Sequence, residues 1–152
     1  MGFKVRVQSI EAKFSASHFL KEPLQCTRLH GHNYYVSVEV SADLDKNHFV
    51  VDFNDLKEKI MSIIKPMDHY ILVPTKSDEL EIREEKDSIE IIAPNKRYVF
   101  PREDVFFLPL QATTSELLAK YIHSKLKEVY LDKKISVRVE ESRSTMAIYS
   151  ED

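Results

Sequence analysis

The sequence predicts an α+β fold in which a four-stranded antiparallel sheet carries two helices on one face, with an inserted hairpin. Segments 3–18, 30–42, 135–141 and 145–149 alternate apolar and polar residues with the period of a half-buried strand. Segments 53–64 and 113–129 instead place apolar residues at helical spacing. Each amphipathic helix must bury one apolar face, and one face of the sheet supplies that surface.

Length and composition exclude several classes of protein. The chain has 152 residues, enough for one domain over 1–152, with 75–110 as an insertion within it. A net charge of -3 argues against nucleic-acid binding. No apolar run approaches the roughly 20 residues of a membrane span, and no secretory leader is recognisable. A single cysteine allows no internal disulfide. We therefore expect a cytoplasmic protein without nucleic-acid or membrane partners.

The first predicted strand ends in a histidine. Its apolar side chains change parity near Gln8-Ser9, from the series Phe3, Val5, Val7 to the series Ile10, Ala12, Phe14, Ala16. One extra residue would produce that change, so we expect a β-bulge there. On the second half of the strand, His18 continues the buried series. A loop over 19–29 follows, with Pro23 and the lone cysteine, Cys26.

The second predicted strand begins with His30 and His32, which share the face of Val36, Val38 and Val40. Gly31 between them permits a close approach of backbone or ligand. If the two strands pair, His18 converges on His30 and His32. Three neutral imidazoles with an open position are the pattern of catalytic zinc. The alternative is that one or more of them is a hydrogen-bonded structural histidine; the combined pattern favours metal.

The middle of the chain predicts a helix over 53–64, capped by Asp52 or Asn54 and stopped by Pro66. The pair Asp68-His69 follows directly. It is either a turn with a hydrogen-bonded histidine or a carboxylate that orients an imidazole for proton transfer. The pair by itself favours the turn.

Residues 75–110 are less regular. An acidic stretch over 77–90 is expected to be solvated, segments 88–92 and 97–100 predict a hairpin, and 105–110 is an apolar run that should pack on the domain. The second helix is expected to open with a capping box, Thr113 at the N-cap and Glu116 at N3. His123 on this helix is expected at the surface.

Taken together, these residues resemble the 6-pyruvoyltetrahydropterin synthase family, which includes the 6-carboxytetrahydropterin synthases of the queuosine and 7-deazaguanine pathway. The resemblance covers nearly the whole chain apart from 75–110. Its motifs occur in the family's order: Phe14-Ser15-Ala16-Ser17-His18, Cys26-x-x-x-His30-Gly31-His32-Asn33-Tyr34, Val51-Asp52-Phe53, Met67-Asp68-His69, Thr113-Thr114-Ser115-Glu116-Leu117-Leu118-Ala119 and Val139-Glu140-Glu141-Ser142. It implies the tunnelling fold, in which the sheets of several subunits join into a barrel, usually in a homohexamer built from two trimers.

The resemblance also implies roles for individual residues. His18, His30 and His32 resemble the ligands of a Zn²⁺ ion. Cys26 resembles the catalytic thiol, although a lone cysteine can also be a small buried hydrophobe, and Asp68 and His69 resemble its catalytic partners. A carboxylate that anchors the pterin ring is matched by Glu141 or its neighbour Glu140, and the strand register favours Glu141. The residues expected near the pterin pocket are Thr113, Thr114 and Glu116.

The implied substrate is 7,8-dihydroneopterin triphosphate. Three residues separate Cys26 from His30, which is similar to the carboxytetrahydropterin synthases, whereas the pyruvoyl-forming enzymes usually have a longer gap. The resemblance therefore favours release of acetaldehyde and triphosphate to give 6-carboxy-5,6,7,8-tetrahydropterin. Two alternatives stay open: a 6-pyruvoyltetrahydropterin synthase that eliminates triphosphate from the same substrate, and a non-catalytic metal-binding protein of the same fold.

Overall fold

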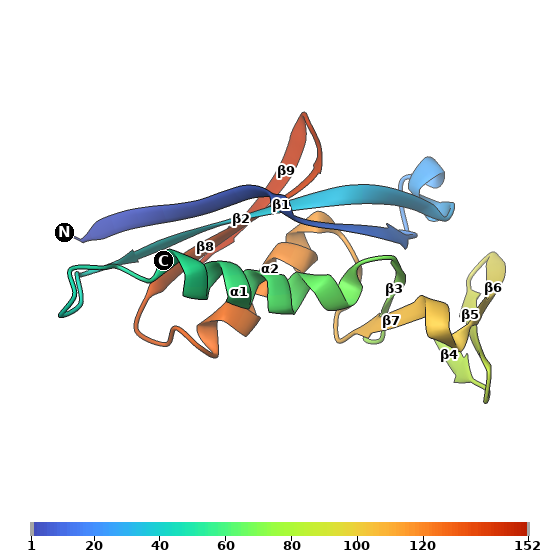
Figure 1. The fold of residues 1–152 in the computed structure, drawn as a ribbon. Coiled ribbons are helices and arrows are strands. Elements are labelled where there is room, and N and C mark those ends of the chain that lie inside the picture. Colours follow the sequence, from blue (N-terminus) through green and yellow to red (C-terminus); the bar gives the residue numbers. More distant parts are fainter. Residues whose placement is uncertain (1, 152) are drawn as a thin grey trace.

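The structure, a computed structural model, describes residues 2–151 apart from the side chain of Ser9. Within these residues, six strands form one sheet in the order β7-β3-β1-β2-β8-β9, and three more form a small second sheet in the order β4-β5-β6 (Figure 1). The strands of the large sheet are β1 (Phe3–His18), β2 (His30–Ala42), β3 (Tyr70–Pro74), β7 (Val105–Leu108), β8 (Lys134–Ser142) and β9 (Thr145–Ser150).

The four predicted strands form the antiparallel part of the large sheet. β1 pairs with β2, β2 with β8, and β8 with β9. The sequence analysis did not predict β3 and β7, which extend the sheet by parallel pairing to β1 and to each other. Both are runs of four or five residues without alternation, because they are covered on both faces, and such runs have no periodic signal.

The expected bulge in β1 is present but longer than one residue. Gln8 lies opposite Ser37 and Lys13 opposite Tyr35, so five steps along β1 face two along β2. Three extra residues on β1 shift the alternation of its buried side chains in the same way as one extra residue would. They also carry Ile10 out of the core, where it is 84% exposed, contrary to the expected buried series. Beyond the bulge, Phe14, Ala16 and His18 are buried as predicted.

Both long helices pack on the same face of the sheet (Figure 1). In α1 (Phe53–Ile64), the N-cap is Asp52, whose carboxylate accepts from the N–H groups of Asn54 and Asp55. The buried stripe consists of Leu56, Ile60 and Ile64. The helix ends at Ile64, and a 3₁₀ turn over Lys65–Met67 contains Pro66. No helix within residues 2–151 has the length and apolar character needed to cross a membrane.

The second helix, α2 (Ser115–Lys127), corrects two expectations. Its N-cap is Thr114, which accepts from the N–H of Leu117, so the cap lies one residue later than predicted and Glu116 does not complete a capping box. His123 is only 2% exposed rather than at the surface, and its ring meets the edge of Tyr149 at 4.8 Å between centroids. The reason is helical spacing, because His123 shares a stripe with Ala119, Ile122 and Leu126.

The inserted segment builds its own sheet from β4 (Glu81–Glu84), β5 (Ser88–Ala93) and β6 (Lys96–Pro101). The hairpin of β5 and β6 was predicted, whereas β4 lies in the stretch expected to be solvated. This sheet extends one end of the molecule (Figure 1). Ile89 and Ile91, on β5 of this sheet, form a second core with Val73 of β3 and with Phe19. Since Phe19 directly follows His18, the insertion packs against the chain beside the predicted metal site.

Candidate metal centre

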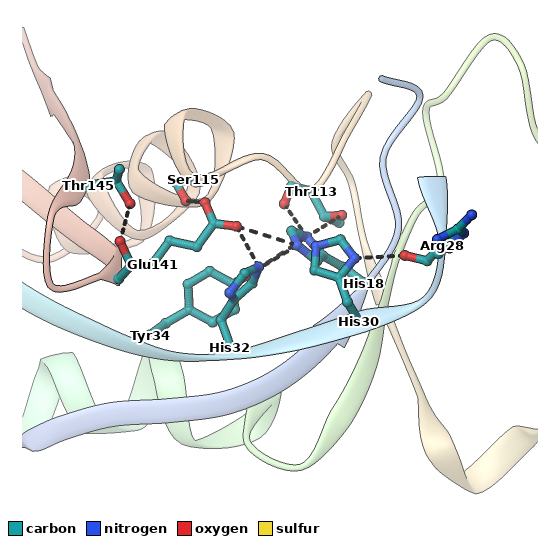
Figure 2. A network of polar contacts seen from close by, with 10 residues as sticks. His18, Arg28, His30, His32, Tyr34, Thr113, Ser115, Glu141 and Thr145 are labelled. Atoms are coloured by element: carbon teal, nitrogen blue, oxygen red, sulfur yellow. Dashed lines mark hydrogen bonds and ion pairs between the residues drawn. The ribbon is translucent and has the colours of Figure 1, made fainter. Parts of the chain in front are cut away.

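Four side chains converge where β1 ends beside the start of β2. His18 lies directly opposite His30 in the strand register, and His32 lies opposite Ala16. The three imidazole rings have centroids 4.7, 5.2 and 5.0 Å apart. With Glu141 on β8 they form a group whose potential ligand atoms all lie within 4.8 Å of one another (Figure 2). The convergence predicted from strand pairing is therefore present, and it includes a carboxylate that strand pairing had not placed there.

Hydrogen bonds fix the orientation of two of these imidazoles. Nδ1 of His18 lies 2.8 Å from the carbonyl oxygen of Thr113, and Nδ1 of His30 lies 2.7 Å from that of Arg28. A carbonyl oxygen can only accept, so each Nδ1 is the protonated nitrogen and donates. Each Nε2 then keeps its lone pair. Backbone carbonyls commonly orient metal-binding histidines in this way.

His32 is held differently. Its Nε2 lies 2.6 Å from Oε1 of Glu141, and Oε1 also lies 3.7 Å from Nε2 of His18. Despite this proximity, Nε2 of His32 is one of two buried side-chain nitrogens within residues 2–151 that have no hydrogen-bond partner. Buried polar atoms are nearly always paired. The His32 nitrogen in contact with the Glu141 carboxylate, together with the two imidazoles that have free lone pairs, is a donor set that fits a divalent metal ion.

Burial favours the neutral form of His18 and His32. His18 is fully buried, and burial lowers its pKa to about 4. The pKa of His32 is also lowered, mainly by burial, against the opposing attraction of Glu141. Burial raises the pKa of the neighbouring Tyr34 phenol, so its hydroxyl stays protonated. Neutral imidazole is the form that binds metal, so the lowered pKa values of His18 and His32 suit metal binding at neutral pH.

Gly31 allows the two strands to approach closely at this point. A Cβ atom at position 31 would lie 3.1 Å from the carbonyl oxygen of Ala16 and 3.7 Å from the Cα of Ser17. A side chain there would push β1 and β2 apart beside His18 and His30. The close approach anticipated from the sequence is thus a backbone contact between the two strands that carry the histidines.

Cys26 lies outside this group of ligands. It sits in a 3₁₀ turn, Leu24–Thr27, and is partly exposed. Its N–H donates to the carbonyl of Pro23, and its own carbonyl accepts from the N–H of Leu20 at 2.8 Å. These bonds close the loop between the two strands. The following carbonyl, that of Thr27, accepts from Oη of Tyr98 and Nζ of Lys96, both at 2.9 Å.

Asp68 and His69 are paired, as the sequence suggested, but they do not join the histidine group. Oδ2 of Asp68 lies 2.9 Å from Nδ1 of His69, whose side chain is 81% exposed. Oδ1 accepts from the N–H of Ser15, and this bond lowers the pKa of the carboxyl. His69 borders a groove that Ser15, Ser17, Gly31 and Asn33 line, together with Ala16 and His32. Ser15, Ser17, Gly31 and Asn33 alternate with the histidines, so most of this groove lies on the other face of the β1–β2 ladder from the histidine group.

The residues expected near the pterin pocket occupy different positions. Thr113 is fully buried beside His18, and Thr114 caps α2. Glu116 is exposed in the first helical turn. Sequence reasoning missed Ser115, whose hydroxyl donates to Oε2 of Glu141 at 2.9 Å. The start of α2 therefore supports the group on two sides, through the hydroxyl of Ser115 and through the carbonyl of Thr113, which precedes the N-cap (Figure 2). Local sequence could not reveal Ser115, because its partner is 26 residues away.

Comparison with known proteins identifies the fold and the family. The chain superposes on the structure of the Plasmodium falciparum 6-pyruvoyl tetrahydropterin synthase with a TM-score of 0.91 and 33% identity, over 99% of this chain and 98% of that one. It thus has the tunnelling fold of these enzymes. A structure from Wolinella succinogenes, WS1659, shares the fold with a TM-score of 0.71 at 17% identity.

Sequence comparison agrees. The family model described as 6-pyruvoyl tetrahydropterin synthase matches residues 8–152, so the chain belongs to that family. It is 31% identical over 149 residues to the 6-carboxy-5,6,7,8-tetrahydropterin synthase of Haemophilus influenzae, covering 94% of this chain and 97% of that protein. It is 33% identical over 138 residues to a putative enzyme of the same name from Pyrococcus horikoshii, covering 87% and 82%. The chain is therefore a pterin-processing enzyme with a group suited to a metal ion.

Proposed function

We propose that the chain is a zinc-dependent 6-carboxy-5,6,7,8-tetrahydropterin synthase that converts 7,8-dihydroneopterin triphosphate, with release of acetaldehyde and triphosphate. The observation that carries this proposal is the group of three imidazoles beside Glu141, two of which, His18 and His30, have free Nε2 lone pairs. The short spacing from Cys26 to His30 and the names of the relatives from Haemophilus and Pyrococcus support the carboxy product. The product belongs to a pathway of the 7-deazaguanine or queuosine type.

His18, His30 and His32 are the residues that would hold the metal. When bound, the ion supplies a positive charge that lowers the pKa of the substrate's side-chain hydroxyls. Imidazole ligands suit zinc, although they also suit copper, iron and nickel. The carbonyls of Thr113 and Arg28 keep two of the rings oriented, so that little reorganisation accompanies binding.

Glu141 is the proposed anchor of the pterin ring. Its carboxylate accepts paired, charge-assisted hydrogen bonds from the amino-pyrimidine edge. The hydroxyl of Ser115 holds Oε2, which fixes the rotamer that presents the carboxylate. Thr113 and Thr114 directly precede α2, Glu116 lies in its first turn, and all three are proposed to border the same pocket.

Cys26 is the proposed catalytic thiol, and the Asp68–His69 pair is the proposed proton shuttle. Asp68 accepts from His69 and stabilises the imidazolium that forms when His69 takes a proton. Because His69 stays apart from the histidine group of its own chain, we expect a second subunit to be needed for the pair to meet a metal site.

The test is product analysis. The zinc-loaded protein is incubated with 7,8-dihydroneopterin triphosphate, and product masses are determined beside a Cys26→Ala variant with equal zinc content. We expect acetaldehyde and a carboxypterin, with turnover reduced at least roughly a hundredfold in the variant. A product that retains every side-chain carbon would replace this proposal with the second candidate. Absence of any product from zinc-loaded protein would leave the non-catalytic alternative.

The second candidate is a 6-pyruvoyltetrahydropterin synthase, which eliminates triphosphate and keeps the carbon chain. The similarity to the Plasmodium falciparum enzyme of that name favours it, because that structure matches the whole chain, including the inserted sheet. The histidines and Glu141 serve both reactions equally. Product mass therefore decides between the two candidates.

A further inference from the structure

A cavity of about 800 Å³ lies beside the histidine group, in a place that the proposed function has not used. Phe19 and Arg28 line it; Phe19 directly follows His18, and Arg28 lies two residues before His30. Ala112, the neighbour of Thr113, also lines it. The opposite wall comes from the insertion, through the turn between β5 and β6 and through Tyr98. The cavity thus begins within two residues of three members of the metal-binding network.

The cavity lies on the side of the histidines away from Glu141. Figure 2 shows the three rings between the Glu141 carboxylate at one end and Arg28 at the other. The proposed substrate has the same linear order, with a pterin ring, a hydroxylated side chain and then three phosphates. With its ring on Glu141 and its hydroxyls at the histidines, its phosphates extend past Arg28 into the cavity.

The charges in the cavity suit an anion. Five charged side chains line it: Lys21, Glu22, Arg28, Glu79 and Lys96. Lys21 and Glu79 neutralise each other in an ion pair at 2.7 Å. Glu22 is exposed and acts on Lys21 through its charge. Among residues 2–151 no ion pair is formed by Arg28 or by Lys96, so both cations are available to a ligand.

The structure also places Lys96 firmly. Its Nζ donates one proton to the carbonyl of Thr27 at 2.9 Å, which leaves two for other acceptors. Tyr98 donates to the same carbonyl and stacks on Phe19 with centroids 4.5 Å apart. The apolar side chains of Leu20, Leu24 and Leu80 line much of the remaining wall. Low-dielectric walls strengthen the attraction between an anion and nearby cations.

We propose that this cavity is the polyphosphate subsite of the enzyme, with Arg28 and Lys96 as the side chains that bind the phosphates. Arg28 offers a planar fork that matches phosphate oxygens in pairs, and Lys96 offers a point charge from the facing wall. The inference rests on the proposed function for the identity of the ligand. It gives the inserted sheet a role in substrate binding, since Lys96 belongs to β6.

The test compares two ligands that differ only in the phosphates. Binding of 7,8-dihydroneopterin triphosphate and of 7,8-dihydroneopterin is measured by calorimetry on zinc-loaded Cys26→Ala protein, so that the ligand is not consumed. Arg28→Gln and Lys96→Gln are added singly and together. Each single substitution is expected to weaken binding of the triphosphate ligand roughly tenfold, and the double variant is expected to weaken it more. Neither substitution is expected to change the affinity for 7,8-dihydroneopterin. Arg97→Gln is the matched control, because Arg97 pairs with Glu90 on the same strand pair.

Inorganic triphosphate separates this inference from the proposed function, with zinc retention monitored throughout. If the protein makes no product but binds inorganic triphosphate, and both variants weaken that binding, the anion subsite stands while the proposed function fails. If the wild-type protein makes product but Arg28→Gln and Lys96→Gln bind the triphosphate ligand as tightly as Arg97→Gln, the subsite is wrong and the proposed function stands. Equal weakening of both pterin ligands would also overturn the subsite, because it would indicate a general disturbance.

Discussion

At the scale of single residues, the chain contains a buried histidine that provides a control for the proposed metal ligands. Nε2 of His32 and Nε2 of His123 are the two unpaired buried side-chain nitrogens in the described part of the chain. Only His32 has other imidazoles beside it, whereas His123 packs against Tyr149. An unpaired nitrogen therefore indicates a ligand only where other donors converge on the same point.

This comparison gives a first prediction. His32→Ala should lower zinc affinity at least roughly a hundredfold, because it removes a direct ligand and outer partners alone are worth ten- to a hundredfold. His123→Ala should leave zinc affinity unchanged and reduce only thermal stability. Zinc titration against a chromophoric chelator measures both variants. Equal zinc affinity in His32→Ala and His123→Ala would contradict the assigned centre.

A second prediction concerns the pH dependence of the metal-free protein. Burial lowers the pKa of His18 from 6.5 to about 4 in the folded state. The unfolded chain therefore takes up this proton first as pH falls, and stability is lost between about pH 6.5 and pH 4. Above pH 6.5 the contribution of neutral, buried His18 to the free energy of unfolding is fully present, and it amounts to about 3 kcal/mol.

Urea unfolding at intervals from pH 7 to pH 4 tests the pH prediction. The free energy of unfolding of the metal-free protein should fall more steeply than that of a His18→Asn variant, which lacks the titrating ring. Zinc-loaded protein should keep its stability to lower pH, since the metal competes with the proton. Parallel pH profiles for the wild-type protein and His18→Asn would show that another group governs the acid loss.

Residue patterns in the sequence predicted part of the centre and missed the rest for a physical reason. The spacing of His30 and His32 is set by the strand pleat, and strand pairing brings His18 to them, so local rules sufficed. The contacts of Glu141 with Ser115 and His32 depend on how β8 and α2 pack in space. The carbonyls that orient the rings are backbone atoms, which have no signature in the side-chain sequence.

At the scale of elements, the inserted sheet acts on the loop that carries Cys26. The Thr27 carbonyl accepts from both Tyr98 and Lys96, and the Arg28 carbonyl accepts from His30. A single stretch of backbone thus links β6, the proposed catalytic thiol and a proposed metal ligand. From its acidic composition, segment 77–90 was expected to be solvated. The structure shows that a strand can keep that composition, because β4 pairs along only one edge and leaves most of its side chains exposed.

The third prediction uses Tyr98→Phe, which removes one hydrogen bond to Thr27 while keeping the ring that stacks on Phe19. A hydrogen bond worth about 1 kcal/mol corresponds to roughly fivefold in the population of an opened loop. Cys26 should then react about fivefold faster with iodoacetamide in the absence of substrate. Tyr70→Phe is the control, since Tyr70 lies on β3 away from this loop. Equal alkylation rates in both variants would show that the inserted sheet does not control the reactivity of Cys26.

At the scale of the whole molecule, the sheet has open edges. β9 pairs on one side only, and its Met146 and Ile148 are exposed. The first part of β1 is also unpaired on one side, because β3 meets β1 only at Ala16 and Ser17. Unpaired strand edges readily pair with another chain. Antiparallel joining of β9 to β1 of a neighbour would close both edges and continue the sheet into a ring of subunits.

The fourth prediction is therefore that the chain assembles through these edges into a homohexamer, which native mass spectrometry can measure directly. Ile148→Lys on β9 should shift the population toward smaller species, because a charge is placed within the joined edges. From the sequence, this assembly was implied only by the family resemblance. A monomer at micromolar concentration would contradict the prediction.

Assembly has a consequence for catalysis that one chain cannot supply. Within a chain, the Asp68–His69 pair stays apart from the histidine group, and most of the groove beside His69 lies on the other face of the β1–β2 ladder, so we expect the proposed centre to take His69 from a neighbouring subunit. Cys26→Ala and His69→Ala should each be inactive alone. When the two are dissociated, mixed in equal amounts and reassembled, about a quarter of the centres should combine an intact Cys26 with an intact His69. Turnover should therefore recover to about a quarter of the wild-type rate. If the mixture stays inactive although mass spectrometry shows mixed hexamers, both residues must act within one chain, and the separation of the pair from the histidine group would have to close in the working enzyme.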